Sequence, residues 1–218
     1  MKLMFITAGR FDLFERNVKS IAAIEDICRV NEISIIDDAS PAPEIEAMAK
    51  LVREILPGRR FTIHTREKPV GYRLQMERWR SLLGDDPFSF HCEDDWEFKE
   101  PGRLITAATD VLQHDPCIAQ VVFTLPCGGN ELLRTANGTG YWISRPGRYL
   151  PYTSNPSIVR VSAFKQAGSF CDELEGHGEH DFGKKLMNLG YLTAFLEQRY
   201  AWHTGHGRSA FTANQTPR

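Results

Sequence analysis

Apolar residues in the first ninety positions alternate between short runs and helical spacing. Runs of strand length occupy 2–7, 32–36, 61–64 and 88–92. The segments between them have helical length and extend over about 12–27, 44–56 and 72–83. Strands that alternate with helices in this way predict an α/β fold with a central, mostly parallel sheet and helices on both faces.

The second half of the chain is less regular. We expect helices at 103–112, 161–167 and 181–189, and strands at 118–124 and 192–196. Residues 127–156 are rich in Gly, Pro, Asn and aromatic side chains, which is typical of loops that fold over a site. No repeat or linker divides the sequence, so we expect one domain over 1–206 and a flexible tail at 207–218.

Composition and charge exclude several classes of protein. The chain has 218 residues, 42% hydrophobic content and a net charge of −2, without the basic tract that nucleic-acid binding requires. No apolar run approaches the roughly 20 residues of a membrane span, and the opening MKLMFITAGR is interpreted as a first strand rather than a signal peptide. Five scattered cysteines without a CxxC pair favour a reduced, cytoplasmic protein. The oligomeric state stays open.

Three consecutive carboxylates, Glu93, Asp94 and Asp95, follow the apolar run at 88–92. Anions beside a buried strand are costly unless a positive charge compensates them. Mg²⁺ or Mn²⁺ with a phosphorylated ligand meets this need, because both ions prefer carboxylate oxygens and leave positions open for phosphate. Asp95 is the candidate metal ligand, and a solvated acidic turn is the alternative.

Two further polar segments follow predicted strands. Thr7-Ala8-Gly9-Arg10 ends the first, and its glycine allows a ligand to approach the backbone; Asp38 ends the second and could accept a hydrogen bond from a nucleoside. In parallel sheets the carboxyl ends of the strands gather ligands, so these segments should converge with the acidic triplet. A turn or helix-start role is the alternative for Asp38. Arg73, with Arg66 and Lys68, either neutralises phosphate or solvates a helix end.

Candidate acids and histidines also occur late in the chain. Glu179 and Asp181 stand at the start of a predicted helix, where a carboxylate either caps the helix or acts as general base for an acceptor hydroxyl. His203 and His206 lie in a glycine-containing loop, and either could complete the metal shell, although HxxH spacing is weak by itself.

Aromatic residues have two possible roles. Tyr141, Trp142, Tyr149 and Tyr152 could form an acceptor wall, although core packing is expected for at least half of them. Trp96 and Phe98 are expected in the core.

Together, these segments resemble the small metal-dependent glycosyltransferases of the GT-A fold, family 2-like enzymes in particular. FITAGRFDLFERNVKSI resembles their opening strand and helix, SIIDDAS their nucleotide motif, and HCEDDWEF their Asp-x-Asp signature. NPSIVRVSAFKQAGSF is similar to their acceptor-side segment, and GEHDFGKKLMNLGY to their Glu-Asp-x-Asp-Phe-Gly-x-Arg-Leu element. The resemblance extends from Met1 to about His206.

The resemblance implies an enzyme that takes a nucleoside-diphosphate sugar, UDP-sugars being the commonest, with Mn²⁺ or Mg²⁺ on the diphosphate. It implies a nucleotide-binding half at 1–100 and an acceptor-binding half at 101–206, the acceptor being a saccharide, a lipid-linked sugar or another small molecule. By position, Asp95 is the metal ligand, joined by His203 or His206. Thr7, Gly9 and Asp38 hold the nucleoside, and Glu93 and Asp94 reach ribose or metal-bound water.

The base position falls on Glu179, and Asp181 matches the later Asp of the same element. The sequence departs from the family here, because Gly178-Glu179 replaces the usual Glu-Asp pair and Lys185 stands where Arg is common. The stereochemistry of transfer therefore stays open. A sugar-nucleotidyltransferase is an alternative, although TAGRFDLF lacks the glycine-rich loop that it would favour, and an inactive nucleotide-sugar-binding module of the same fold is another.

Overall fold

The computed structural model describes residues 1–100, 102–126, 131–143, 152–171 and 178–206, so the predicted tail at 207–218 lies outside the described residues. The helices are α1 (Phe11–Ala22), η1 (Ile27–Arg29, a 3₁₀ turn), α2 (Ala42–Ile55), α3 (Tyr72–Ser81), α4 (Leu104–His114), α5 (Val161–Ala167) and α6 (Gly178–Asn188). The strands are β1 (Lys2–Thr7), β2 (Glu32–Asp37), β3 (Arg60–His64), β4 (Phe88–Glu93), β5 (Trp96–Phe98), β6 (Ile118–Val122), β7 (Glu131–Arg134), β8 (Gly140–Ile143), β9 (Ser157–Arg160), β10 (Leu192–Leu196) and β11 (Ala201–His203).

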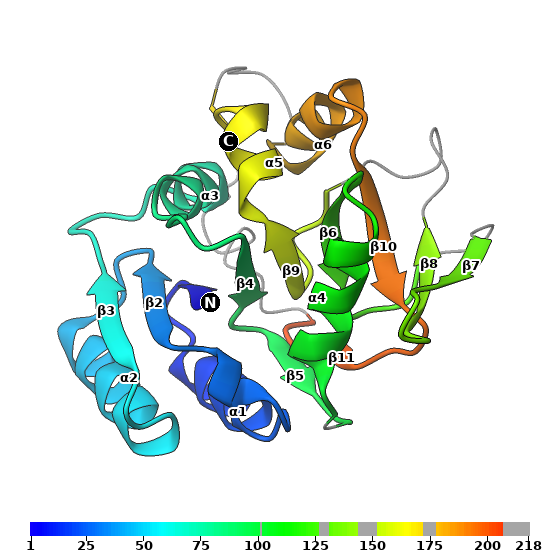
Figure 1. The fold of residues 1–218 in the computed structure, drawn as a ribbon. Helices are drawn as coiled ribbons and strands as arrows, with labels where there is room; N and C mark the ends of the chain where they lie inside the picture. The colour runs from blue at the N-terminus through cyan, green and yellow to red at the C-terminus, as the bar shows by residue number, and fades with distance from the viewer. Residues whose placement is uncertain (101, 127–130, 144–151, 172–177, 207–218) are drawn as a thin grey trace.

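A nine-stranded sheet forms the centre of the molecule, in the order β3-β2-β1-β4-β9-β6-β10-β8-β7 (Figure 1). Strands β1 to β4 are parallel, as the strand–helix alternation predicts. Strand β9 lies antiparallel between β4 and β6, and β8 is antiparallel to β10. The sheet is therefore mostly parallel, and the predicted α/β class is confirmed. A short β5–β11 ribbon lies beside it.

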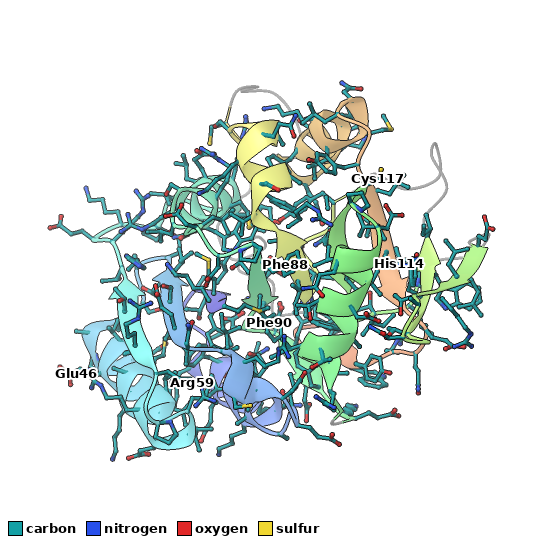
Figure 2. All side chains as sticks on the ribbon, viewed as in Figure 1. Glu46, Arg59, Phe88, Phe90, His114 and Cys117 are labelled. Atoms are coloured by element: carbon teal, nitrogen blue, oxygen red, sulfur yellow. The ribbon has the colours of Figure 1, made fainter. Side chains whose placement is uncertain are left out.

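Two apolar cores cover the two faces of this sheet. Alternate residues of β1 separate them: Leu3 and Phe5 join the core under α1, α2 and α4, and Met4 and Ile6 join the core under α3, α5 and α6. Phe88 and Phe90 of β4 lie near the middle of the molecule (Figure 2). Strands β1, β2 and β4 are thus buried on both faces, whereas the edge strand β3 is partly exposed. The three buried strands end in the polar residues Thr7, Asp37 and Glu93.

The predicted boundaries are confirmed for some elements and differ by several residues for others. Helix α5 and strand β10 match the prediction, but α1 ends at Ala22, five residues early, and the chain then turns through η1. Strands β5, β9 and β11 were not predicted, because three or four residues are too few for a periodic pattern. The predicted loop at 127–156 contains the β7–β8 hairpin. Within the described residues, no helix has the length and apolar character needed to cross a bilayer.

Asn17 ties the turn after β4 to helix α1. Its side chain is completely buried, and its Nδ2 donates to the carbonyl oxygens of Glu93 (3.1 Å) and Trp96 (2.7 Å). Asn17 thereby holds both ends of the Asp94–Asp95 turn against the helix, so the conformation of the acidic segment depends on packing inside the domain.

We expect Asn17→Ala to lower the free energy of unfolding by about 1–3 kcal/mol, because two carbonyls lose a buried donor. Urea unfolding at pH 7 measures the change. Asn137→Ala is the matched control, because Asn137 donates to Asp110 at an exposed position and its loss should cost under about 0.5 kcal/mol. Equal effects of the two substitutions would contradict the role given to Asn17.

Candidate active site

The three polar strand ends meet, as predicted. Thr7 Oγ1 donates to Asp94 Oδ2 over 2.8 Å, which joins the end of β1 to the turn after β4. The Asp38 amide donates to Thr7 O (3.0 Å), and the Gly9 amide donates to Ser40 Oγ (2.8 Å), which joins β1 to the loop after β2. Ala8 and Gly9 lie between these contacts and are partly or fully exposed. This convergence follows from the parallel order β2-β1-β4.

Arg10 pairs with two of the three acids. Its guanidinium contacts Asp94 through Nη2 and through Nε (3.3 Å to Oδ2), and Nη1 lies 3.0 Å from Asp95 Oδ2. Asp94 is completely buried, and burial raises its pKa to about 6 although Arg10 and Thr7 oppose the shift. Burial lowers the pKa of Arg10, but the charges of Asp94 and Asp95 outweigh it and the net shift is upward.

Glu93 is the last residue of β4 and directly precedes the Asp94–Asp95 turn. Burial raises its pKa well above the ordinary value, and the charges of Asp95, Asp94 and Glu179 add to the shift. Tyr72, at the start of α3, senses the same two glutamates: burial raises its pKa, and Glu93 and Glu179 raise it further. Glu93 and Glu179 therefore share one electrostatic environment, although they lie far apart in the sequence.

Asp95 is enclosed by the segment after β11. The Thr204 amide and hydroxyl both donate to Asp95 O, at 2.7 and 3.0 Å. His203 Nε2 lies 3.3 Å from Asp95 Oδ2, and the His203 ring packs edge-on against Trp96 and His206. A Cβ added to Gly205 would lie 2.6 Å from Asp95, so only glycine fits there without displacing the carboxylate. Trp96 and Phe98 are buried in the core, as predicted.

Asp95 and His203 form the candidate metal-binding pair. Asp95 Oδ1 is buried without a hydrogen-bond partner among the described residues, and His203 Nε2 lies beside the other carboxylate oxygen. Within that same part of the chain, no three His, Cys, Asp or Glu side chains gather closely enough to enclose an ion. The pair fits a hard divalent cation that takes its remaining ligands from phosphate and water, which is how Mg²⁺ is usually held. His206 is exposed and touches His203 rather than Asp95.

The two aspartates after β2 organise loops. Asp37 is completely buried and accepts hydrogen bonds from Ser40 and Thr65. Asp38 accepts from the amides of Val70 (2.8 Å) and Gly71 (2.9 Å) and from Gln75 Nε2 (2.8 Å). The turn role considered for Asp38 is thus present, because its carboxylate fixes the chain that leads into α3. Its contact with a nucleoside stays a prediction.

Glu179 lies where a buried polar network holds the chain before β9. The Ser154 amide donates to Glu179 Oε1 over 2.5 Å, and His91 Nε2 donates to Ser154 O over 3.0 Å. Gln120 exchanges two hydrogen bonds with the backbone of Thr153 (2.7 and 3.1 Å). His91, Gln120 and Ser154 were not predicted from the sequence. The available signal was a polar residue inside each of two apolar strands, His91 in β4 and Gln120 in β6.

Asp181 points elsewhere. Its Oδ1 lies 3.4 Å from His180 Nδ1 and 3.8 Å from Lys184 Nζ, both on its own helix. Arg73 donates through Nε to Phe170 O (3.3 Å) and packs against Gly178. Lys185 donates to Ser169 O over 2.6 Å. Of the two candidate bases, Glu179 alone is tied to the loop before β9.

The predicted aromatic wall is only partly accessible. Tyr141 is 2% exposed and Tyr152 is 4% exposed, which matches core packing and leaves little ring for an acceptor. Trp142 is partly buried and donates to Glu197 O over 3.3 Å. Strand β8 lies four positions from β4 in the sheet order, so an acceptor role for Tyr141 and Trp142 has no support from their place in the fold. Tyr149 lies outside the described residues.

Solved structures share this architecture. S. aureus TarS 1–349 in complex with UDP-GlcNAc is 14% identical with a TM-score of 0.68, covering 99% of this chain and 61% of that one. GalNAc-T7 with UDP, GalNAc and Mn²⁺ is 13% identical with a TM-score of 0.67, covering 93% of this chain and 43% of that one. The mannosyltransferase PcManGT from Pyrobaculum calidifontis, in complex with GDP-Man and Mn²⁺, is 13% identical with a TM-score of 0.63. The match covers 88% of this chain and 53% of that one.

These likenesses show the predicted GT-A fold. The chain spans less than two thirds of the length of each of these structures. The sequence matches no family model, and a search of curated proteins finds no match.

The buried His91 makes a pH-dependent contribution to stability. Burial lowers its pKa to about 4 from an ordinary 6.5, although the hydrogen bond to Ser154 O opposes the shift. The unfolded chain binds this proton first, so the stabilising effect is complete above pH 6.5 and is lost as the pH falls towards 4. Between pH 7 and pH 5 the loss should be about 2 kcal/mol.

We expect His91→Gln to remove this part of the acid sensitivity, which urea unfolding at pH 7 and pH 5 measures for both proteins. The exposed His114, labelled in Figure 2, provides the control: His114→Gln should keep the wild-type difference between the two pH values. A His91→Gln protein that loses as much stability at pH 5 as the wild type would show that His91 titrates normally.

Proposed function

We propose that this chain is a metal-dependent glycosyltransferase that moves a sugar from a nucleoside-diphosphate donor to an acceptor hydroxyl. The observation that carries the proposal is the meeting of the ends of β1, β2 and β4 around Asp94 and Asp95, in a fold whose solved relatives include complexes with nucleotide sugars. Such a meeting point of parallel strands is where α/β sheets bind ligands.

Asp95 and His203 would hold the divalent cation, Mn²⁺ or Mg²⁺. Asp95 Oδ1 offers an oxygen that nothing else in the described part of the chain uses, and His203 offers an adjacent nitrogen. A cation there would stabilise the charge that develops on the leaving diphosphate. Two of the three solved structures, those of PcManGT and GalNAc-T7, contain Mn²⁺, which supports this donor set.

Thr7, Gly9 and Asp38 would border the nucleoside, and Glu93 and Asp94 the ribose. Asp38 fixes the Val70–Gly71 backbone, and the Gly9 amide fixes Ser40, so this border is rigid before a ligand arrives. UDP is the favoured nucleotide because the TarS and GalNAc-T7 structures contain uridine nucleotides, whereas PcManGT contains GDP-Man.

Glu179 would remove the proton from the acceptor hydroxyl. Its Oε1 accepts the Ser154 amide, which fixes the carboxylate, and the contacts among the described residues leave its other oxygen for a proton. Asp181 is paired with its helix neighbours and serves the start of α6. The geometry therefore favours Glu179 where the sequence alone left the two acids open.

We expect Asp95→Asn to remove metal-dependent binding and turnover, because an amide oxygen is a much weaker ligand for a hard cation. Wild-type protein should melt several degrees higher with UDP and Mn²⁺ than with either alone, since ligands that bind only the native state stabilise it by mass action. It should also release UDP from UDP-GlcNAc slowly with water as acceptor, and chelator should stop the release.

The control for this test is Asp85→Asn, which changes an exposed aspartate that pairs only with Lys165 in the described structure. That protein should behave as wild type. Undiminished UDP release in chelator, or from the Asp95→Asn protein, would contradict the metal role. A thermal-shift screen of other nucleoside diphosphates would identify the preferred base.

We expect Glu179→Gln to lower the rate of UDP release by about 10²–10⁴-fold, the usual contribution of a general base. The shift in melting temperature with UDP and Mn²⁺ should stay unchanged, because Glu179 is not among the residues proposed to border the nucleotide. Asp181→Asn, two residues along the same helix, should retain most of the activity. If Asp181→Asn loses activity and Glu179→Gln retains it, Asp181 is the general base and not Glu179.

If the wild-type protein binds UDP and Mn²⁺ but neither hydrolyses UDP-GlcNAc nor glycosylates any of a panel of simple sugars, the fold serves as a nucleotide-sugar-binding module. Glu179→Gln would then change nothing that these assays measure.

A further inference from the structure

Arg10 contacts both Asp94 and Asp95, and the proposed reaction gives no role to these contacts. Its guanidinium makes three contacts with Asp94 and Asp95, and all three side chains are at least 87% buried, with exposed fractions of 13%, 0% and 9%. A planar guanidinium that spans two carboxylates is held more firmly than a single surface ion pair. Arg10 is therefore part of the site, although it lies at the very start of α1.

Two buried carboxylates need a positive charge whether or not a metal ion is bound. Removal of one partner of a buried ion pair is strongly destabilising because the other charge is left uncompensated. Arg10 supplies this charge in the protein alone. A divalent cation that binds Asp95 Oδ1 must then share the Asp95 carboxylate with Arg10, whose Nη1 lies 3.0 Å from Oδ2. Two cations on one carboxylate repel each other unless an anion joins them.

A diphosphate is such an anion. It would compensate both the cation at Asp95 and the guanidinium of Arg10, which is a good geometric match for phosphate oxygens. We propose that Arg10 is the resident counter-cation of the Asp94–Asp95 pair, so that the protein alone binds Mn²⁺ weakly and binds it well only together with a nucleoside diphosphate. The diphosphate half of this statement depends on the function proposed above.

The proposal makes metal and nucleotide binding reciprocal. If UDP raises the affinity for Mn²⁺ by some factor, Mn²⁺ must raise the affinity for UDP by the same factor. Arg10 sets the size of that factor, because it weakens metal binding in the absence of the anion and contacts the anion when it is present. Substitution of Arg10 should therefore change the coupling as well as the affinities.

The test measures free Mn²⁺ by electron paramagnetic resonance during titration of the protein, with and without UDP. We expect Arg10→Gln to bind Mn²⁺ at least tenfold more tightly than the wild type when UDP is absent, and UDP to increase Mn²⁺ affinity much less in this variant. Arg10→Lys keeps one charge but cannot span both carboxylates, and it should give intermediate values.

Arg16→Gln is the matched control, because Arg16 lies on α1, six residues after Arg10, and pairs with Glu97 at an exposed position. It should titrate as wild type. Because Arg10→Gln could lower stability, melting temperatures are measured in parallel. Mn²⁺ alone should raise the melting temperature of Arg10→Gln and should not raise that of Arg10→Gln combined with Asp95→Asn.

Arg10→Gln and Arg10→Lys proteins that bind Mn²⁺ no more tightly than the wild type would overturn the proposal. The metal titration without UDP tests Arg10 independently of any activity. If the wild type binds UDP and Mn²⁺ together while the Arg10 variants leave Mn²⁺ affinity unchanged, only the role of Arg10 fails. If UDP binds to no protein in the series but Arg10→Gln gains affinity for Mn²⁺, the proposed function fails and the counter-cation role remains.

Discussion

The burial of carboxylates at the end of β4 is the constraint on which the rest of the structure depends. Strand β4 lies in the middle of the sheet with a core on each face, so Asp94 and Asp95 emerge where water is largely excluded. Thr7 at the end of β1 and Arg10 just before α1 contact these carboxylates directly, and Asn17 and Thr204 hold the backbone of the turn that carries them. These contacts hold two buried carboxylates in place at the end of β4.

The second half of the domain adds a chemically different group on the other face. Strand β9 runs antiparallel between β4 and β6 and brings the preceding loop against His91 and Gln120, which hold the backbone of Thr153 and Ser154. The Ser154 amide then fixes Glu179 at the start of α6. Asp95 and Glu179 are thus each positioned by a separate set of hydrogen bonds.

The sequence predicts the first half of the fold well because its strands are long and apolar and its helices have one apolar face. It also predicts the convergence of TAGR, DDAS and EDDW, because parallel order alone brings carboxyl ends to one edge. Prediction is weaker in the second half, since β9 and β11 are too short for a periodic signal and the pairing of β9 with β4 joins residues about seventy positions apart. The role of His91 and Gln120 in holding the Thr153–Ser154 backbone could not be predicted, because a single polar residue in an apolar strand does not indicate which group it binds.

Gly205 limits how the sequence around this site can vary during evolution. No positive φ requires glycine there, and the residue is confined by space alone, since any Cβ would meet the Asp95 side chain. Thr204 joins the same carboxylate-bearing residue through its backbone from 109 positions away. The two segments are therefore locked together at atomic spacing, and an insertion or deletion in either one would have to be matched in the other. Among related sequences, insertions and deletions should occur in the outer loops and not in these two segments.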